Sequence, residues 1–193
     1  MISKFRIGVL VIILNFFASV ATTWGQVENP SLLQMAVPSL NIAPDARGGG
    51  MGDMGAATLP DINSQYWNAA KYAFMGSKAG VSLSYTPWLR KLVNDVALVN
   101  MTGYYKLGNS DLQAISASLR YFSLGEVNIW ENIGDVPYGL NPYEMAFDVA
   151  YSRKLSESYS MAVTLRYIRS DMGTDQNEES NAGNAFAADI SGY

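Results

Sequence analysis

The residues that decide the fold are Ser77-Lys78-Ala79-Gly80-Val81-Ser82-Leu83-Ser84-Tyr85-Thr86-Pro87-Trp88. From Val81 to Thr86, large apolar side chains alternate with small hydroxyl side chains. Successive side chains of a β-strand point to opposite faces, so the alternation predicts a strand with one apolar and one polar face. Two-faced strands of about ten residues are typical of a transmembrane β-barrel, which meets lipid outside and is polar inside.

The same alternation recurs to the end of the chain, and the connections between its segments differ in length. The sequence predicts strands over 77–88, 96–107, 112–124, 143–155, 159–169 and from 184 onward. Their connections run medium, short, long, short and long, over 89–95, 108–111, 125–142, 156–158 and 170–183. Outer-membrane barrels have short periplasmic turns and longer external loops, so this parity is expected if the first strand runs outward.

The alternation also assigns a face to each side chain. The outward, lipid-facing set is predicted to be Ile115, Ala117, Leu119, Tyr121, Met145, Phe147, Val149, Tyr151, Met161, Val163, Leu165, Tyr167, Phe186, Ala188 and Ile190. The inward set contains Arg120, Asp148, Arg166 and Asp189, whose charges alternate in sign on neighbouring strands. We expect these four to form a lumenal charge ladder. The alternative is that each charge meets water separately, because strand register cannot be read from sequence.

The N-terminus carries the features of a secretory signal. Lys4 and Arg6 precede an apolar run over 7–20, and small residues precede a cleavage point at Gln26. The run is shorter than the roughly 20 residues that a membrane-spanning helix needs. Residues 1–25 are therefore interpreted as a signal peptide, 26–76 as a plug segment, and 77–193 as part of an outer-membrane β-barrel.

The predicted plug segment is rich in proline and glycine, with one helical turn expected over 61–72. Within it, Gly50, Gly52 and Gly55 have the spacing of a dinucleotide-binding loop. The context argues against a nucleotide, because no strand precedes the motif and no amphipathic helix follows it. The glycines instead indicate positive φ angles or close backbone approach. Candidate structural residues of the plug are Asp45, Arg47, Gly48, Gly50, Gly52 and Asn68.

Asp45 and Arg47 allow two interpretations, an acid–base pair or a structural tether. The tether is favoured, because no nucleophile or base accompanies them.

Composition excludes several kinds of chemistry. The chain has no cysteine and no histidine, so Ser-His-Asp and Cys-His mechanisms cannot be assembled from it. Without Lys4 and Arg6 the net charge is near −6, which argues against nucleic acid as a partner. The acidic loop over 170–183 lacks the spacing of a calcium-binding EF-hand. No cofactor, metal or catalytic residue is expected, and the chain is predicted not to be an enzyme.

Two aromatic residues of the long connection, Trp130 and Tyr138, are candidate contacts for an extracellular partner. The alternative is that they pack within the loop or belong to an aromatic girdle.

Five stretches of the chain carry a resemblance to a known family. Those over 41–53 and 64–74 resemble the N-terminal part of the PorV/PorQ family, and those over 83–95, 116–125 and 165–171 resemble its PorV branch. The resemblance implies a FadL-like outer-membrane barrel of 14 strands in a Bacteroidetes type IX secretion system. It also implies partners: a SprA-type translocon, a PorU-type sortase, and the C-terminal signal domains of cargo proteins.

The chain departs from the family pattern in two ways. Ala69 follows Asn68 where the family usually has proline. Six strands are also too few to close a barrel, so we expect an N-terminal fragment with a curved, open sheet.

Three hypotheses about function follow. The first is a non-enzymatic shuttle that carries cargo from translocon to sortase. The second is a FadL-like channel for hydrophobic small molecules, with 27–75 as its hatch. The third, a lipid A deacylase, is disfavoured by the missing histidine.

Overall fold

A computed structural model describes residues 37–88, 90–91, 95–108, 112–129, 138–172 and 182–193. Four short helices come first: η1 (Pro38–Asn41), α2 (Ala46–Gly50), α3 (Ser64–Trp67) and η2 (Ala69–Phe74). The strands are β1 (Ala79–Pro87), β2 (Val96–Leu107), β3 (Gln113–Leu124), β4 (Val127–Ile129), β5 (Tyr138–Leu140), β6 (Tyr143–Ser156), β7 (Tyr159–Asp171) and β8 (Gly183–Gly192). The predicted signal peptide lies outside the described residues.

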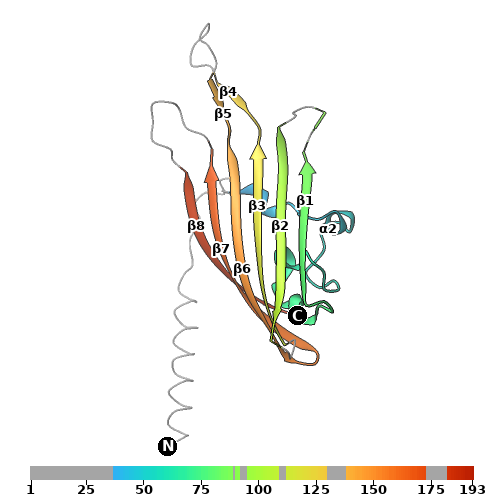
Figure 1. The fold of residues 1–193 in the computed structure, drawn as a ribbon. Coiled ribbons are helices and arrows are strands. Elements are labelled where there is room, and N and C mark those ends of the chain that lie inside the picture. The colour runs from blue at the N-terminus through green and yellow to red at the C-terminus, as the bar shows by residue number, and fades with distance from the viewer. Residues whose placement is uncertain (1–36, 89, 92–94, 109–111, 130–137, 173–181) are drawn as a thin grey trace, which may run out of the picture. The chain divides into compact units, whose positions relative to one another are not determined.

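Six of the strands form one antiparallel sheet in the order β1-β2-β3-β6-β7-β8 (Figure 1). Each long strand pairs with the next one along the chain, and β1 and β8 form the two edges. The predicted all-β, antiparallel architecture is confirmed, and the sheet is open, as expected of part of a barrel wall. The bounds of β2 agree with the prediction, and the other five long strands agree to within two residues.

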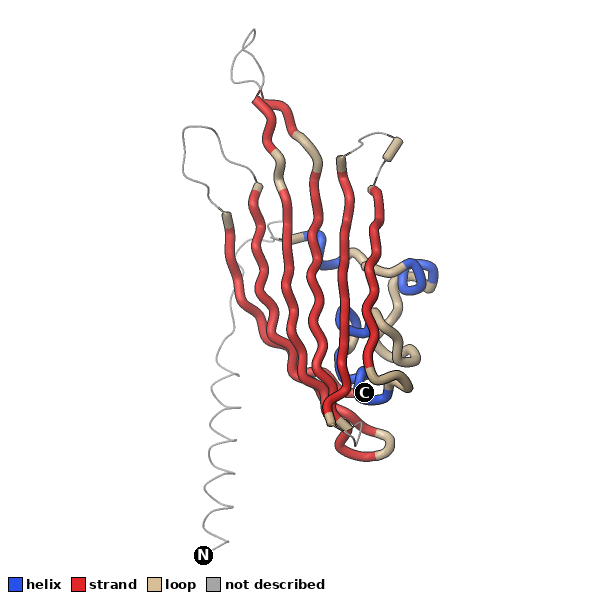
Figure 2. Tube along the Cα trace, in the orientation of Figure 1, coloured by secondary structure: helices blue, strands red, loops and turns tan. Residues whose placement is uncertain are grey.

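The connections divide the sheet into two ends. β2 ends and β3 begins at the same end of the sheet at which β6 ends and β7 begins, here called the short-turn end (Figure 2). The other ends of these strands lie at the opposite end, here called the long-loop end. There β4 and β5 form a small two-stranded sheet that extends beyond β3 and β6. The alternation does not predict this pair, because strands of three residues are too short to display a period of two.

The two faces of the sheet differ as predicted. On the outer face, apolar side chains are exposed; the exposed fraction is 71% for Leu83, 44% for Phe147 and 63% for Leu165. On the inner face the alternate residues are buried or half-buried along β2, β3, β6 and most of β7. Polar side chains are thus covered and apolar side chains are exposed, the reverse of a water-soluble sheet.

The buried core lies between the sheet and η2. It consists of Ala69, Ala70, Tyr72, Tyr104, Ala114, Ala150 and Ala162. The sheet's three alanines come from β3, β6 and β7, and η2 contacts these strands as well as β2 and β8. Because alanine projects only a methyl group, the helix lies close to the strand backbones at normal packing density. Among the described residues, no helix is long and apolar enough to cross a membrane.

Candidate functional site

The candidate site is the contact between the N-terminal segment 37–76, here called the plug segment, and the inner face of the sheet. The plug segment contains all four helices, none longer than six residues. Helices this short are not stable alone, so contacts with the sheet and between loops must hold them. Those contacts are mostly hydrogen bonds from side chains to backbone groups.

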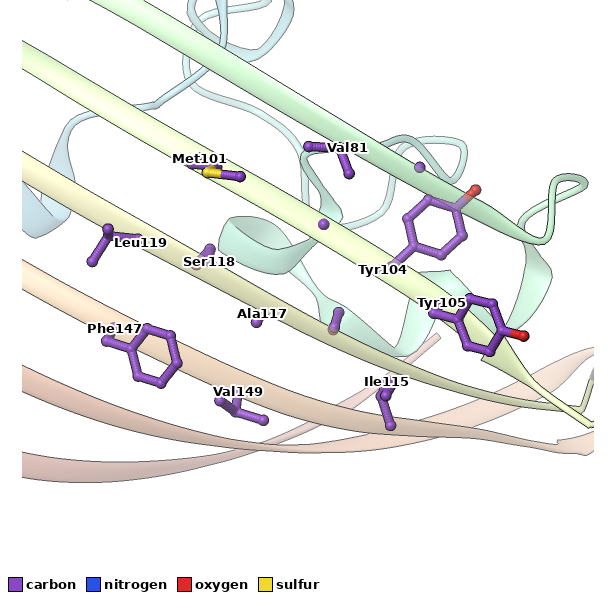
Figure 3. Close-up of a pocket in the computed structure, with 13 residues that line it drawn as sticks. Val81, Met101, Tyr104, Tyr105, Ile115, Ala117, Ser118, Leu119, Phe147 and Val149 are labelled. Atoms are coloured by element: carbon purple, nitrogen blue, oxygen red, sulfur yellow. The ribbon is translucent and has the colours of Figure 1, made fainter.

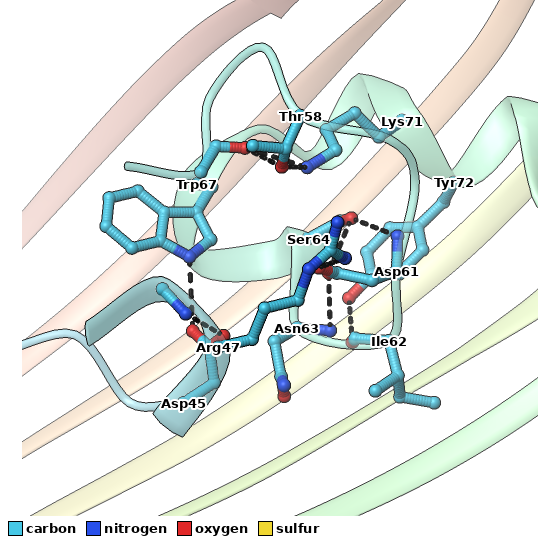
Figure 4. A network of polar contacts seen from close by, with 12 residues as sticks. Asp45, Arg47, Thr58, Asp61, Ile62, Asn63, Ser64, Trp67, Lys71 and Tyr72 are labelled. Carbon is cyan, nitrogen blue, oxygen red and sulfur yellow. Dashed lines mark hydrogen bonds and ion pairs between the residues drawn. The ribbon is translucent and has the colours of Figure 1, made fainter. Parts of the chain in front are cut away.

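Asp45 and Arg47 take different partners within the plug segment (Figure 4). Asp45 caps α2: one carboxylate oxygen accepts from the Gly48 N–H at 2.8 Å, and the other accepts from Trp67 Nε1 at 3.2 Å. Arg47 pairs with Asp61, at 2.8 Å between Nη1 and Oδ2. Asp45 and Arg47 therefore do not pair with each other, and each makes its own contacts within the plug segment. Capping turns the Asp45 side chain back over the helix start, away from the arginine.

The predicted glycines differ in what they do. A Cβ on Gly48 would lie 2.8 Å from the Trp67 ring, and one on Gly55 would lie 2.2 Å from it. Gly52 adopts a φ of +74°, a conformation that favours glycine. Gly50, in contrast, lies in α2 with open space where a side chain would be, so the structural role predicted for it has no support.

The position of α2 also argues against a dinucleotide-binding loop at Gly50, Gly52 and Gly55. A dinucleotide loop needs a helix that begins after the first glycines, whereas α2 ends at Gly50.

Asn68 joins the plug segment to the far edge of the sheet. Its side-chain oxygen accepts from the Ala70 N–H at 3.0 Å and so caps η2. Its amide nitrogen donates to the Gly192 carbonyl of β8 at 2.8 Å. One side chain therefore both starts the helix and fixes it to a strand 124 residues away.

Two buried residues of η2 were not predicted as site residues. Lys71 is fully buried and donates from Nζ to the Gly55 carbonyl at 2.8 Å and to Thr58 Oγ1 at 3.1 Å. Burial lowers the pKa of Lys71, and the nearby Asp61 carboxylate partly opposes this shift. A lysine within an alanine-rich stretch is the sequence signal that could have identified it.

Tyr72 lies beside Lys71 and is also fully buried. Its ring stacks on Tyr104 of β2, at 4.9 Å between centroids, and its hydroxyl donates to the Ile62 carbonyl at 2.8 Å. Burial raises the pKa of this phenol, so Tyr72 stays neutral and acts as a hydrogen-bonding centre.

The first turn of the plug segment is clamped between two charged side chains of the sheet. Glu144 of β6 accepts from the Ser39 N–H at 3.0 Å, and Arg120 of β3 donates to the Ser39 carbonyl at 2.9 Å. The Arg120 guanidinium also lies 4.5 Å from the centroid of the Tyr66 ring. Glu144 is fully buried and was not predicted. Its inward position follows from the same alternation that places Asp148 inward, whereas its neighbours Phe122 and Ser170 could have been found only from the register.

Three serines, on β1, β3 and β7, donate further bonds. Ser84 of β1 donates to the Pro44 carbonyl at 2.6 Å, Ser116 of β3 donates to Gln65, and Ser160 of β7 donates to the Ala70 carbonyl at 2.8 Å. The plug segment is thus fastened to β1, β3, β6, β7 and β8 by hydrogen bonds.

Three of the four residues predicted for the charge ladder lie together. Arg166 donates from Nε to Asp148 Oδ1 at 2.6 Å, and its Nη1 lies 3.8 Å from Asp189 Oδ2. Arg120 is the exception. Among the described residues it makes no ion pair, because its guanidinium is occupied by Ser39 and Tyr66.

The two predicted partner contacts belong to the connection between β3 and β6. Trp130 lies outside the described residues. Tyr138 belongs to β5, where its backbone pairs with Ile129. Their role as contacts remains a prediction.

The plug network offers hydrogen bonds and packing, with the Asp45 carboxylate used in a helix cap and the Asp61 carboxylate in an ion pair. In the described part of the chain, no group of three or more Asp or Glu residues has the geometry to hold a metal ion.

The fold and the site define a class: a β-barrel wall with an apolar outer face, whose polar inner face is covered by the chain's own N-terminal segment. Residues 26–193 match the family model described as type IX secretion system protein PorV, and the chain belongs to this family. A search of curated protein sequences found no match. Family membership makes the chain a component of the type IX secretion machinery.

Proposed function

We propose that this protein is a non-enzymatic outer-membrane component of the type IX secretion system. It would bind the C-terminal signal domain of secreted cargo and pass the cargo from a SprA-type translocon to a PorU-type sortase and attachment complex. Membership of the PorV family supports the secretion role. The shuttle step and its partners rest on the resemblance of the sequence stretches to that family.

The outer face supports location in the outer membrane. Tyr121 and Tyr143 stack at the long-loop end, at 5.5 Å between ring centroids, and Tyr105 and Tyr151 lie toward the short-turn end. Tyr143 and Tyr151 are eight positions apart on β6, about 26 Å along the strand. At a tilt of about 40° this spans roughly 20 Å of membrane, close to the apolar band of about 25 Å between the aromatic girdles of barrels.

The fastening of the plug segment to the sheet favours the shuttle function over the channel function. Ser39 is clamped by two buried charges, and hydrogen bonds with β1, β3, β7 and β8 hold the rest of the plug segment. A hatch that must open for each transported molecule would have to break buried, charge-assisted bonds, each worth about 1.5–3 kcal/mol. Cargo handled by the loops of the long-loop end would leave the plug segment in place.

One observation favours the second candidate function, a FadL-like channel for hydrophobic small molecules. A cavity of about 420 Å³ lies between the plug segment and the end of β1, lined by residues that include Ile42, Asp45, Thr86 and Trp88. Its size is within the range of small-molecule sites, about 300–1,000 Å³.

Co-purification separates the two functions. Tagged full-length protein, extracted from its native membrane, is expected to retain cargo C-terminal signal domains, and deletion of its gene is expected to stop cargo secretion. Retention of fatty acids alone, with secretion intact after deletion, would overturn the shuttle and favour the channel.

The loops supply a sharper comparison. Replacing 130–137 by a glycine-serine linker of equal length is expected to reduce cargo retention, with Trp130 as its main contact. The same replacement of 109–111 serves as the control, since the strands that it joins, β2 and β3, meet at the opposite end of the sheet.

A further inference from the structure

A depression lies in the apolar outer face of the sheet (Figure 3). It has a volume of about 490 Å³ and lies over β1, β2, β3 and β6. Its floor is made by Gly103 and Ala117, which are direct neighbours in register. The larger side chains around them form the rim, namely Val81, Met101, Tyr105, Ile115, Leu119, Phe147 and Val149.

The depression exists because two small residues coincide in one row of the sheet. Gly103 has no side chain and Ala117 has only a methyl group, while Val81 and Val149 continue the same row on either side. A Cβ on Gly103 would meet Val81 at 3.7 Å, an ordinary contact. Packing therefore does not require glycine at this position, and the depression can be filled without strain.

The ammonium group of Lys78 lies at the short-turn end of this depression. The Nζ of Lys78 lies 6.0 Å from the centroid of the Tyr105 ring, which forms part of the rim. The Lys78 carbonyl accepts from the Lys106 N–H at 2.8 Å, which fixes the lysine backbone beside β2. Lys78 is exposed and makes no ion pair with a carboxylate among the described residues. An apolar groove thus ends at an unneutralised ammonium group beside a phenol.

We propose that this depression binds one anionic phospholipid of the leaflet at the short-turn end. An acyl chain would occupy the space over Gly103 and Ala117, and the phosphate would meet Lys78 with the Tyr105 hydroxyl as a second donor. The shape favours a hydrocarbon chain, because the rim side chains are almost all apolar. The charge favours an anionic head group, since each lysine near such a surface strengthens binding by a factor of about five.

The inference rests on the membrane location in the proposed function, so the test must separate the two. The full-length chain is refolded into phosphatidylethanolamine vesicles and extracted in mild detergent. Native mass spectrometry then counts bound phosphatidylglycerol and phosphatidylethanolamine during titration. We expect one tightly bound phosphatidylglycerol per chain, with a weaker series for phosphatidylethanolamine.

Two variants probe the two ends of the site. Gly103→Leu fills the floor and is expected to weaken binding of both lipids about tenfold. Lys78→Gln is expected to weaken phosphatidylglycerol about fivefold and leave phosphatidylethanolamine unchanged. Ala188→Leu, in the same sheet row on β8, and Lys91→Gln, at the long-loop end, are the matched controls and are expected to bind as the parent does.

Each result decides something. If Gly103→Leu folds, as judged by heat-modifiable electrophoretic mobility, and binds phosphatidylglycerol like the parent, the lipid site is wrong while the membrane location stands. Equal losses in the two controls would also overturn it. Failure of the parent chain to insert into vesicles would overturn the membrane location and the lipid site together.

Discussion

Asp148 on β6 and Arg166 on β7 lie directly opposite each other on the inner face, and two hydrogen bonds of 2.6 and 3.2 Å join the guanidinium to the carboxylate. Ser118 of β3 donates to the same carboxylate at 3.2 Å. Three neighbouring strands are therefore connected by one acidic side chain. Because the acid is almost buried, removing its charge leaves a guanidinium with little water to replace the lost partner.

The first prediction follows from that pair. Asp148→Asn is expected to lower the free energy of unfolding by about 2–3 kcal/mol, less than for a fully buried pair because 20% of the Arg166 side chain is exposed. The measurement is the urea midpoint of the full-length chain in lipid vesicles. Asp189→Asn is the control: at 3.8 Å and 57% exposure it is expected to cost less than about 1 kcal/mol. Equal losses in the two variants would contradict this difference.

The second prediction concerns Trp67 and its glycine neighbours. Gly55→Ala places a methyl group inside the indole ring, so the ring must move, at a cost of about 3 kcal/mol. Gly49→Ala, in α2, meets no atom within 4 Å and is expected to be neutral or stabilising by up to about 1 kcal/mol. Urea midpoints of the two alanine variants test this, and a neutral Gly55→Ala would show that Trp67 is not held as described.

The third prediction concerns the clamp on Ser39. Glu144→Ala removes the acceptor of the Ser39 N–H and is expected to loosen the start of the plug segment by about 1.5–3 kcal/mol. Trypsin should then cut faster after Arg47, which mass spectrometry of the released peptide would measure. Glu144→Gln is expected to restore most of the protection, because its amide oxygen still accepts. Glu157→Ala, on the exposed turn after β6, is the control, and trypsin should cut it at the same rate as the parent.

The fourth prediction uses the pKa of Lys71. Burial holds this pKa below its ordinary value of 10.5. At a pH between the folded-state pKa and 10.5, unfolding therefore takes up a proton. The lysine's destabilising contribution is full below the folded pKa and disappears as pH rises through that window. Raising the pH toward 10.5 is therefore expected to stabilise the parent relative to Lys71→Met. The measurement is the urea midpoint of each protein as a function of pH. Exposed Lys91→Met should show no such change relative to the parent, and the same pH trend there would refute the assignment to Lys71.

The strands and their faces could be predicted because they depend on local sequence. Leu83 and Phe147 alternate with polar neighbours whatever the rest of the chain does, and a period of two has one structural meaning. The inward position of Asp148 and Arg166 follows from the same counting. Their pairing depends on register, which alternation alone leaves open.

The plug segment was predictable only in part. Its irregular texture and its helical turn are visible in the sequence, and the glycine cluster indicates close packing. The partners of those residues are not visible, because Ser39 and Glu144 are 105 positions apart and Asn68 and Gly192 are 124 apart. The inward position and the charge of Arg120 predict a place in the ladder, but neither identifies its partner. Only the folded chain brings Ser39 and Tyr66 within its reach.

The two-faced strands and the alternation of short and long connections follow from the sequence alone, since they are properties of short-range order. Tertiary structure decided the fastening of the plug segment, the partner of each buried charge and the depression over Gly103 and Ala117. These depend on register and on three-dimensional packing, which bring together residues whose positions in the sequence carry no sign of one another.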